Sequence, residues 1–178
     1  MSDKKTGKFP PSSCYLLLMQ KPALNYQIAP DDFSDWQGLY DLLVECFDYM
    51  DGRIDPPSSL KQMTPTSLEQ KAEAETLVIV TNNNMLVGCG YLKLTDKALY
   101  IGKLAVKPGF RRQGILRRII NIAETKARQH QKPSLELETR IELVENHTTF
   151  ARLGFVKTAE TSHPDYEKIT GITMNKQV

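Results

Sequence analysis

Hydrophobic residues recur at helical or strand spacing along most of the chain after residue 22. One apolar stripe, which Asp31 or Asp32 would cap, predicts a helix that ends near Gly52; its members are Phe33, Trp36, Leu39, Tyr40, Leu43 and Phe47. Further helices are expected over residues 65–75, 116–130 and 146–153. β-rich or alternating runs predict strands over residues 25–29, 76–81, 85–94, 99–106, 135–139, 155–161 and 169–176.

The order of these elements, β-α-α-β-β-β-α-β-α-β-β, predicts a mixed α/β fold of the α+β kind. Consecutive strands followed by a strand–helix–strand crossover over residues 104–137 indicate a central mixed, mostly antiparallel sheet with helices on both faces. Such a crossover is expected to be right-handed. Residues 23–178 are interpreted as a single domain, and residues 1–22 as an N-terminal extension.

Overall charge points to no special class of partner. The formal net charge of the 178 residues is only +2, so neither nucleic acid nor an anionic membrane surface is an expected partner. The apolar run over residues 14–19 is too short to span a bilayer. The residues after it do not form the small-residue cleavage site of a signal peptide.

The cysteines and histidines also favour an ordinary cytoplasmic protein without a metal. The cysteines are odd in number and show no paired spacing, which favours reduced thiols over disulfides; they are Cys14, Cys46 and Cys89. Helical and strand patterns place the last two in the core. The histidines match no metal-ligand spacing; they are His130, His147 and His163.

A glycine-containing loop is the clearest functional signal. The junction between strand 99–106 and the next helix carries Arg111-Arg112-Gln113-Gly114-Ile115-Leu116. Backbone N–H groups at a helix start favour an anion, most simply a pyrophosphate. The plainer alternative for Arg111 and Arg112 is a solvated helix start, although cations there oppose the helix dipole unless an anion is bound. Nucleic-acid binding is disfavoured because no stacking aromatic motif accompanies the arginines.

These residues resemble the GNAT superfamily of N-acetyltransferases, and the likeness extends over residues 26–176. The loop fits that family's signature Gln/Arg-x-x-Gly-x-Gly/Ala, except that Leu116 stands where Gly or Ala is usual. Strand residues 104–106 with Pro108, and the later pair Gly154-Phe155, are also similar. Residues 51–60 resemble a largely uncharacterised bacterial branch of the superfamily.

The resemblance implies a three-layer αβα fold in which acetyl-CoA lies between two splayed parallel strands, 99–106 and 135–139. It implies that the whole loop 111–116 binds the pyrophosphate and that the backbone of Leu104, Ala105 and Val106 holds the pantetheine. Asn146 and Phe150 would contact the cofactor arm. The implied reaction is transfer of acetyl to a primary amine of a small molecule or peptide, by an enzyme that is often a homodimer.

Glu138 is the candidate general base. Alternation sends Leu135, Leu137 and Thr139 to one face of their strand and Glu136, Glu138 and Arg140 to the other. Family spacing from Gly154 places Glu138 where some peptide-amine acetyltransferases carry their base. The alternative is a polar strand face paired with Arg140.

The other reactive positions depart from the family pattern. Phe150 stands where many members carry a tyrosine that protonates the leaving thiolate, and Leu143 stands where an asparagine is usual. Tyr166, in the loop before the last strand, is the candidate replacement acid, with a partly buried loop aromatic as the alternative. These departures keep open a second reading, a catalytically weak or inactive acyl-CoA-binding module.

Acceptor recognition is assigned to charged residues in the proline-bounded loop after the first helix. Asp51, Arg53 and Asp55 lie there close together in the sequence. A stiff loop with concentrated charge is a suitable place to bind a polar substrate. An ordinary surface turn with solvated charges remains the alternative.

Overall fold

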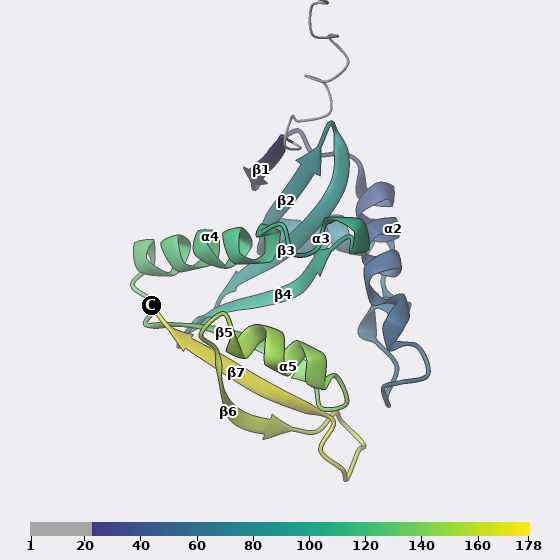
Figure 1. The fold of residues 1–178 in the computed structure, drawn as a ribbon, viewed down its shortest axis with the longest axis vertical. Coiled ribbons are helices and arrows are strands. Elements are labelled where there is room, and N and C mark those ends of the chain that lie inside the picture. The colour runs from purple at the N-terminus through teal and green to yellow at the C-terminus, as the bar shows by residue number, and fades with distance from the viewer. Residues whose placement is uncertain (1–22) are drawn as a thin grey trace, which may run out of the picture.

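The computed structural model describes residues 23–178, and the predicted N-terminal extension with Cys14 lies outside the described residues. Figure 1 shows the arrangement of the elements. The strands are β1 (Leu24–Ile28), β2 (Thr76–Asn82), β3 (Met85–Leu94), β4 (Leu99–Val106), β5 (Ser134–Arg140), β6 (Val156–Thr161) and β7 (Gly171–Gln177). The α-helices are α2 (Trp36–Phe47), α3 (Pro65–Ala74), α4 (Ile115–Gln129) and α5 (Val144–Ala151).

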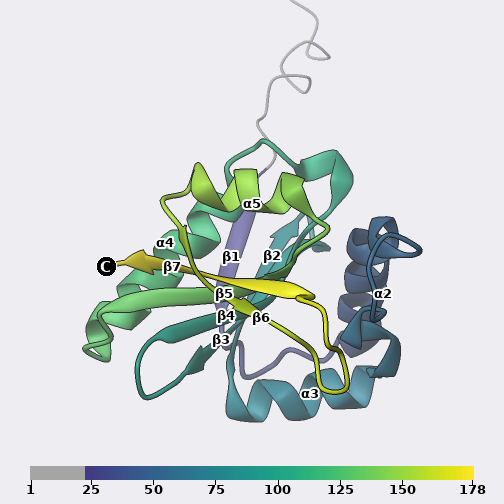
Figure 2. The same ribbon diagram turned by 90° about the horizontal axis from the view of Figure 1, so that it is seen from below.

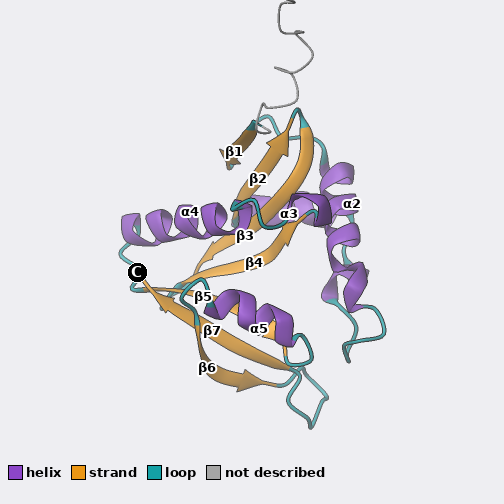
Figure 3. Cartoon of the chain, viewed as in Figure 1, coloured by secondary structure: helices purple, strands orange, loops and turns teal. Residues whose placement is uncertain are grey.

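The strands form one seven-stranded sheet in the order β1-β2-β3-β4-β5-β7-β6. Every neighbouring pair is antiparallel except β4 and β5, which are parallel. This pair is joined only at Leu99↔Leu135 and Tyr100↔Glu136, and beyond those residues the two strands separate, as Figure 3 shows. The predicted mixed, mostly antiparallel sheet with a splayed parallel pair is therefore confirmed.

Helices cover both faces of the sheet, which gives the predicted three layers. Figure 2 shows α4 and α5 on one face and α2 and α3 on the other. On the first face, Ile119, Ile120 and Ala123 of α4 pack against buried residues of the sheet, and Phe150 of α5 packs beside them. On the second face the core consists mainly of Leu39, Leu42, Leu43, Cys46, Leu68, Leu77, Ile79, Cys89 and Tyr91.

The start of α2 differs from the sequence-based prediction. The helix begins at Trp36, and the Asp35 carboxylate caps it by accepting a hydrogen bond from the Gly38 N–H at 3.0 Å. Asp31 and Asp32 are not the cap. Phe33 lies before the helix and packs edge-to-face on Trp36, with ring centroids 4.7 Å apart. The apolar spacing therefore identified the packing surface, but it could not separate the helix from the aromatic residue that precedes it.

A β-bulge interrupts β4 at the point where the strand leaves β5. Its register with β3 shifts between Cys89↔Ala105 and Tyr91↔Gly102. Lys103 has a φ of +48° in this irregular stretch. Nothing in the residue pattern indicated the bulge, because Lys103 is not a residue that favours positive φ.

The two cysteines that the structure describes, Cys46 and Cys89, are unpaired and buried, as expected. Burial raises the pKa of the Cys46 thiol to about 11. Within residues 23–178, every helix is too short or too polar to cross a membrane.

Candidate functional site

A cavity of about 960 Å³ lies where β4 and β5 separate. Its walls come from the end of α2, the second half of β4, the loop into α4, the end of β5 and one face of α5. Many residues assigned to the site from the sequence line it: Leu104, Ala105, Val106, Arg111, Arg112, Gly114, Ile115, Leu116, Glu138, Asn146 and Phe150. The other five, Gln113, Asp51, Arg53, Asp55 and Tyr166, are not among its lining residues.

Gly114 forms the start of α4 on the wall of the cavity. It has a left-handed φ of +83° and serves as the N-cap. Within residues 23–178, no side chain caps this helix, so the N–H groups of its first turn are left without intrahelical acceptors. A Cβ placed on Gly114 would meet nothing within 4 Å. The helix start is therefore open to a ligand and suited to an anion.

The charged side chains of this loop differ in how they are held. Arg111 donates from Nε to the Val106 carbonyl at 3.2 Å, which keeps it against the cavity wall. Arg112 and Arg117 also line the cavity. Gln113 instead donates from its side chain to the Gly109 carbonyl at 3.3 Å. This bond uses one of the two side-chain N–H groups of Gln113.

The inner edge of β4 forms a second wall. Pairing with β5 ends at Tyr100, so the alternate backbone groups of residues 101–106 that face β5 have no partner strand there. Leu104, Ala105 and Val106 belong to this edge. An extended ligand with amide groups can hydrogen-bond to such an edge as a neighbouring strand would.

Titratable side chains gather on the α2 side of the same opening. Glu138 is exposed and lines the cavity. Burial, followed by the negative charges of Glu138 and Glu136, raises the pKa of Tyr100 to about 12. Burial lowers the pKa of Lys103, whose Nζ donates to the Ser59 hydroxyl at 2.8 Å. Glu138 and Glu145 are the two carboxylate residues that line the cavity, and Glu145 is held by Arg53.

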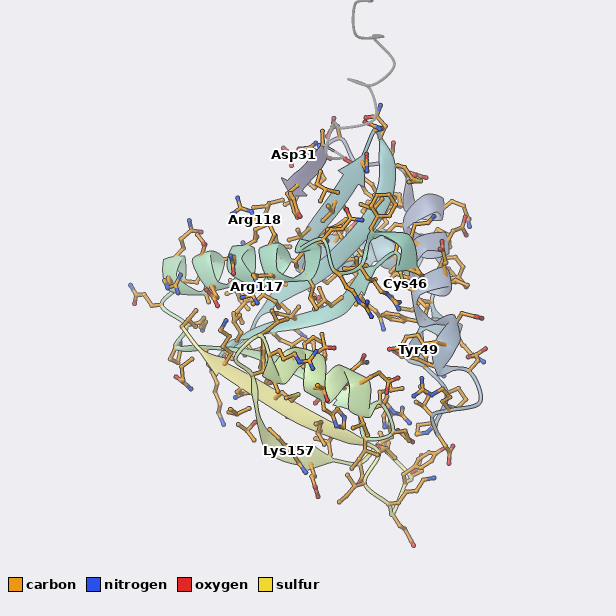
Figure 4. All side chains as sticks on the ribbon, viewed as in Figure 1. Asp31, Cys46, Tyr49, Arg117, Arg118 and Lys157 are labelled. Atoms are coloured by element: carbon orange, nitrogen blue, oxygen red, sulfur yellow. The ribbon has the colours of Figure 1, made fainter. Side chains whose placement is uncertain are left out.

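The end of α2 reaches across the cavity to α5. Asn146 donates from Nδ2 to the Tyr49 hydroxyl at 3.0 Å, and Figure 4 shows Tyr49 projecting from the α2 side toward α5. Burial raises the pKa of Tyr49, although the Asn146 contact opposes that shift. Beside it, Arg53 pairs with Glu145 at 2.7 Å. These contacts bridge one side of the opening.

The predicted acceptor-binding residues lie outside the cavity wall. Asp55 accepts from the Tyr166 hydroxyl at 3.0 Å and pairs with Lys168 at 2.7 Å. The bonds from Lys168 and Tyr166 lower the pKa of Asp55, and its carboxylate in turn raises the pKa of Tyr166. Asp51 pairs with Lys61 at 2.9 Å. The Asp55 contacts join the loop after α2 to the loop before β7, whereas the Asp51–Lys61 pair lies within the connection between α2 and α3.

Sequence reasoning missed several residues that line the cavity, namely Tyr49, Tyr100, Ser59, Arg140 and His163. Strand alternation could have found Tyr100, because Leu99 and Ile101 on either side are buried with the α4 core. The alternation of β5 already placed Arg140 on the same face as Glu138. Tyr49, Ser59 and His163 come from separate segments, and no local signal brings them together. His147 is partly buried, and its Nε2 lies 2.9 Å from the Arg140 carbonyl oxygen.

Metal chemistry has no obvious location in the described part of the chain. Across residues 23–178, no three His, Cys, Asp or Glu side chains gather closely enough to hold a metal ion.

Sequence comparison gives one family match. The model of the acetyltransferase (GNAT) family matches residues 36–155. A comparison with curated proteins gives no match.

Solved structures share the fold at low sequence identity. A GNAT-family acetyltransferase from Staphylococcus aureus Mu50 is 13% identical, with a TM-score of 0.67, 87% of this chain covered and 99% of the other. The PaiA N-acetyltransferase from Thermoplasma acidophilum, in complex with coenzyme A, is 13% identical, with a TM-score of 0.70 and coverages of 88% and 99%. A GNAT-family acetyltransferase from Elizabethkingia anophelis, with acetyl-CoA bound, is 19% identical, with a TM-score of 0.62 and coverages of 89% and 100%.

Proposed function

Because the chain belongs to the acetyltransferase (GNAT) family and is therefore an acyltransferase, we propose that it moves acetyl from acetyl-CoA to a primary amine of a small molecule or peptide. One observation carries the proposal. The uncapped helix start at Gly114 and the unpaired edge of β4 open into the same cavity. The similar structures from Elizabethkingia anophelis and Thermoplasma acidophilum hold acetyl-CoA and coenzyme A, respectively.

The Gly114 loop and the neighbouring edge of β4 would contact successive parts of acetyl-CoA. The pyrophosphate would lie on the N–H groups after Gly114, with Arg112 and Arg117 supplying positive charge. The pantetheine would run along Leu104–Val106, with Phe150 providing an apolar contact. A β4 N–H directed at the thioester carbonyl would stabilise the oxyanion, an effect worth about 3 kcal/mol in comparable sites.

Glu138 would accept the proton of the attacking amine, since the other carboxylate that lines the cavity, Glu145, is paired with Arg53. The leaving thiolate needs a proton donor that Phe150 does not provide. Tyr166, the candidate from sequence, bonds Asp55 outside the wall, whereas Tyr49 lines the cavity and bonds Asn146 on the helix that carries Phe150. Geometry therefore supports Tyr49 over Tyr166 as the acid, with water as the alternative donor.

An acyl-CoA-binding module without turnover is the second candidate. It is favoured by three departures from the family pattern, Phe150, Leu143 and Leu116. For both candidate functions we propose a cytoplasmic location, which the free thiols of Cys46 and Cys89 support.

Two measurements separate the candidates. Thermal-shift screening of acyl-CoAs should select acetyl-CoA or a close relative, because binding to the folded state raises the melting temperature. An amine panel followed by thiol-release detection should then give turnover. Binding with no turnover across the panel would support the module, and no binding of any acyl-CoA would reject both.

A further inference from the structure

Building on the proposed function, we infer that the acceptor is an amino acid, a primary amine that carries its own carboxylate. The side chain of Arg140 would bind that carboxylate while Glu138 receives the proton of the amine. Both residues line the cavity. The inference rests on the Arg140 guanidinium, in which two buried N–H donors have no hydrogen-bonded acceptor among the described residues.

Arg140 has two donors with nothing to bond. Its side chain is only 13% exposed, and Nε and Nη2 are buried without a hydrogen-bond partner among the described residues. The nearest carboxylate oxygen, Oε2 of Glu142, is 3.7 Å from Nε, which is too far for a hydrogen bond. Buried charged donors without acceptors are costly. Nε and Nη2 form the side-on fork of a guanidinium, which matches the two oxygens of a carboxylate.

The opposite end of the guanidinium is held in place by the last loop. Nη1 lies 3.2 Å from His163 Nε2, and because arginine only donates, the imidazole must accept there. The histidine proton then sits on Nδ1, which is 2.6 Å from the Thr170 hydroxyl. His163 is therefore a positioning residue that fixes Arg140 through Nη1, while Nε and Nη2 of the side-on fork are left without a hydrogen-bonded acceptor among the described residues.

Glu138 and Arg140 are arranged to bind the two ends of one small molecule. They are two residues apart on the same face of β5, so their Cα atoms are about 7 Å apart. Two carboxylates lie near Arg140, and neither gives its side-on fork a hydrogen bond. Glu142 forms an ion pair with Arg140 through Oε2, 3.7 Å from Nε, without a hydrogen bond. Asp55 pairs with Lys168, and Glu142 accepts from the Asp55 N–H at 3.2 Å.

An apolar part of this wall indicates the side chain of the amino acid. Phe47, Met50 and Ile54 line the cavity on the α2 side. An apolar side chain such as that of leucine or methionine would bury surface against them. Lys103 on the β4 wall is also positively charged. It would repel a second ammonium group, so an acceptor with a cationic side chain is disfavoured.

The transfer balances without a further reactant. The amine nitrogen forms a bond to the thioester carbon, the C–S bond breaks, and the electron pair leaves with the CoA sulfur. The amine proton goes to Glu138, and the thiolate takes a proton from the acid or from water. The products are an N-acetylamino acid and CoA thiol.

The test compares acceptors that differ only in the carboxylate. Thiol release from acetyl-CoA is measured with leucine, leucinamide and 3-methylbutylamine. Wild type should prefer leucine in kcat/KM by about 10- to 100-fold, as expected for a charged hydrogen-bonded pair. Arg140→Gln should remove most of this preference through KM, and Arg140→Lys should restore only part of it. Arg128→Gln is the matched control at an exposed arginine paired with Glu124 on α4.

Each outcome decides the question. If leucinamide and 3-methylbutylamine are turned over as well as or better than leucine, the inference is overturned and the proposed function stays intact. Equal losses for all three acceptors in Arg140→Gln would assign Arg140 a structural role and also overturn it. If no amine turns over, calorimetry of leucine with the CoA-loaded protein decides: binding that requires Arg140 and exceeds that of leucinamide supports the inference, and no such binding rejects it. The absence of turnover alone counts against the proposed function.

Discussion

Tyr49 and Asn146 meet across the cavity, with the amide nitrogen of Asn146 3.0 Å from the tyrosine oxygen. They lie 97 residues apart in sequence. Tyr49 belongs to the short 3₁₀ turn that continues α2, and Asn146 belongs to the first turn of α5. This bond, with the neighbouring Arg53–Glu145 pair, joins the two sides of the molecule at the point where β4 and β5 have separated.

The bond should contribute measurably to stability. Tyr49→Phe and Asn146→Leu, combined in a double-mutant cycle, should show a coupling of about 1 kcal/mol in urea unfolding, typical of a neutral hydrogen bond. Tyr40→Phe on the same helix, combined with Asn146→Leu, is the matched control and should be additive. Additive effects for Tyr49 and Asn146 would show that the bond contributes nothing to folding.

Gly114→Asp should abolish CoA binding. The new carboxylate would lie where the pyrophosphate is proposed to bind, and the expected loss of affinity is about 100-fold or more. Gly114→Asn is the control, because asparagine has the same shape and tolerates the left-handed backbone about as well as aspartate. Calorimetry measures both. If the two variants bind equally, charge at this position is irrelevant to the ligand.

Glu138→Gln should lower kcat by about 100-fold or more, the range for loss of a general base. CoA affinity should stay the same, because Glu138 belongs to β5 and the proposed phosphate and pantetheine contacts come from the Gly114 loop and β4. Glu136→Gln, two residues earlier on the same strand face, should keep wild-type turnover. Initial rates and CoA titrations distinguish the two effects, and wild-type kcat in Glu138→Gln would remove it as the base.

Stability should fall at high pH because of buried tyrosines. The pKa of Tyr100 is raised to about 12, mainly by burial, whereas an unfolded tyrosine titrates near about 10. Above about pH 10 the unfolded chain releases this proton first, so the free energy of unfolding declines until the folded pKa is passed. Urea unfolding across this range should show a shallower decline in Tyr100→Phe. Some decline should persist, because burial also raises the pKa of Tyr91. An identical slope would contradict the assignment.

Local patterns were enough to predict most of the framework. The alternation along β5, which buries Leu135 and Leu137 and turns Glu138 outward, is confirmed. A local cause also fixes the start of α3, where the Thr64 hydroxyl accepts a hydrogen bond from the Ser67 N–H. In both cases the cause lies within a few residues of the effect, either in the pleat of a strand or in a side chain that reaches its own helix start.

The acceptor side was harder to predict because it is assembled over long distances. Arg140 is held by a loop more than twenty residues later, at His163. Asp55 is tied to Tyr166, 111 residues further along the chain. Lys103 faces the opening from a bulge that its residue type does not favour. These contacts depend on how strands from different parts of the chain come together.

The two-residue seam between β4 and β5 has a mechanical consequence. On either side of it the sheet is held by long antiparallel ladders, so we expect the sheet to bend most easily along this seam. A carrier whose amides bond to both free edges would act as an inserted strand and stiffen that line. Loading the protein with its donor would then complete its architecture, and release of the spent carrier would loosen it again.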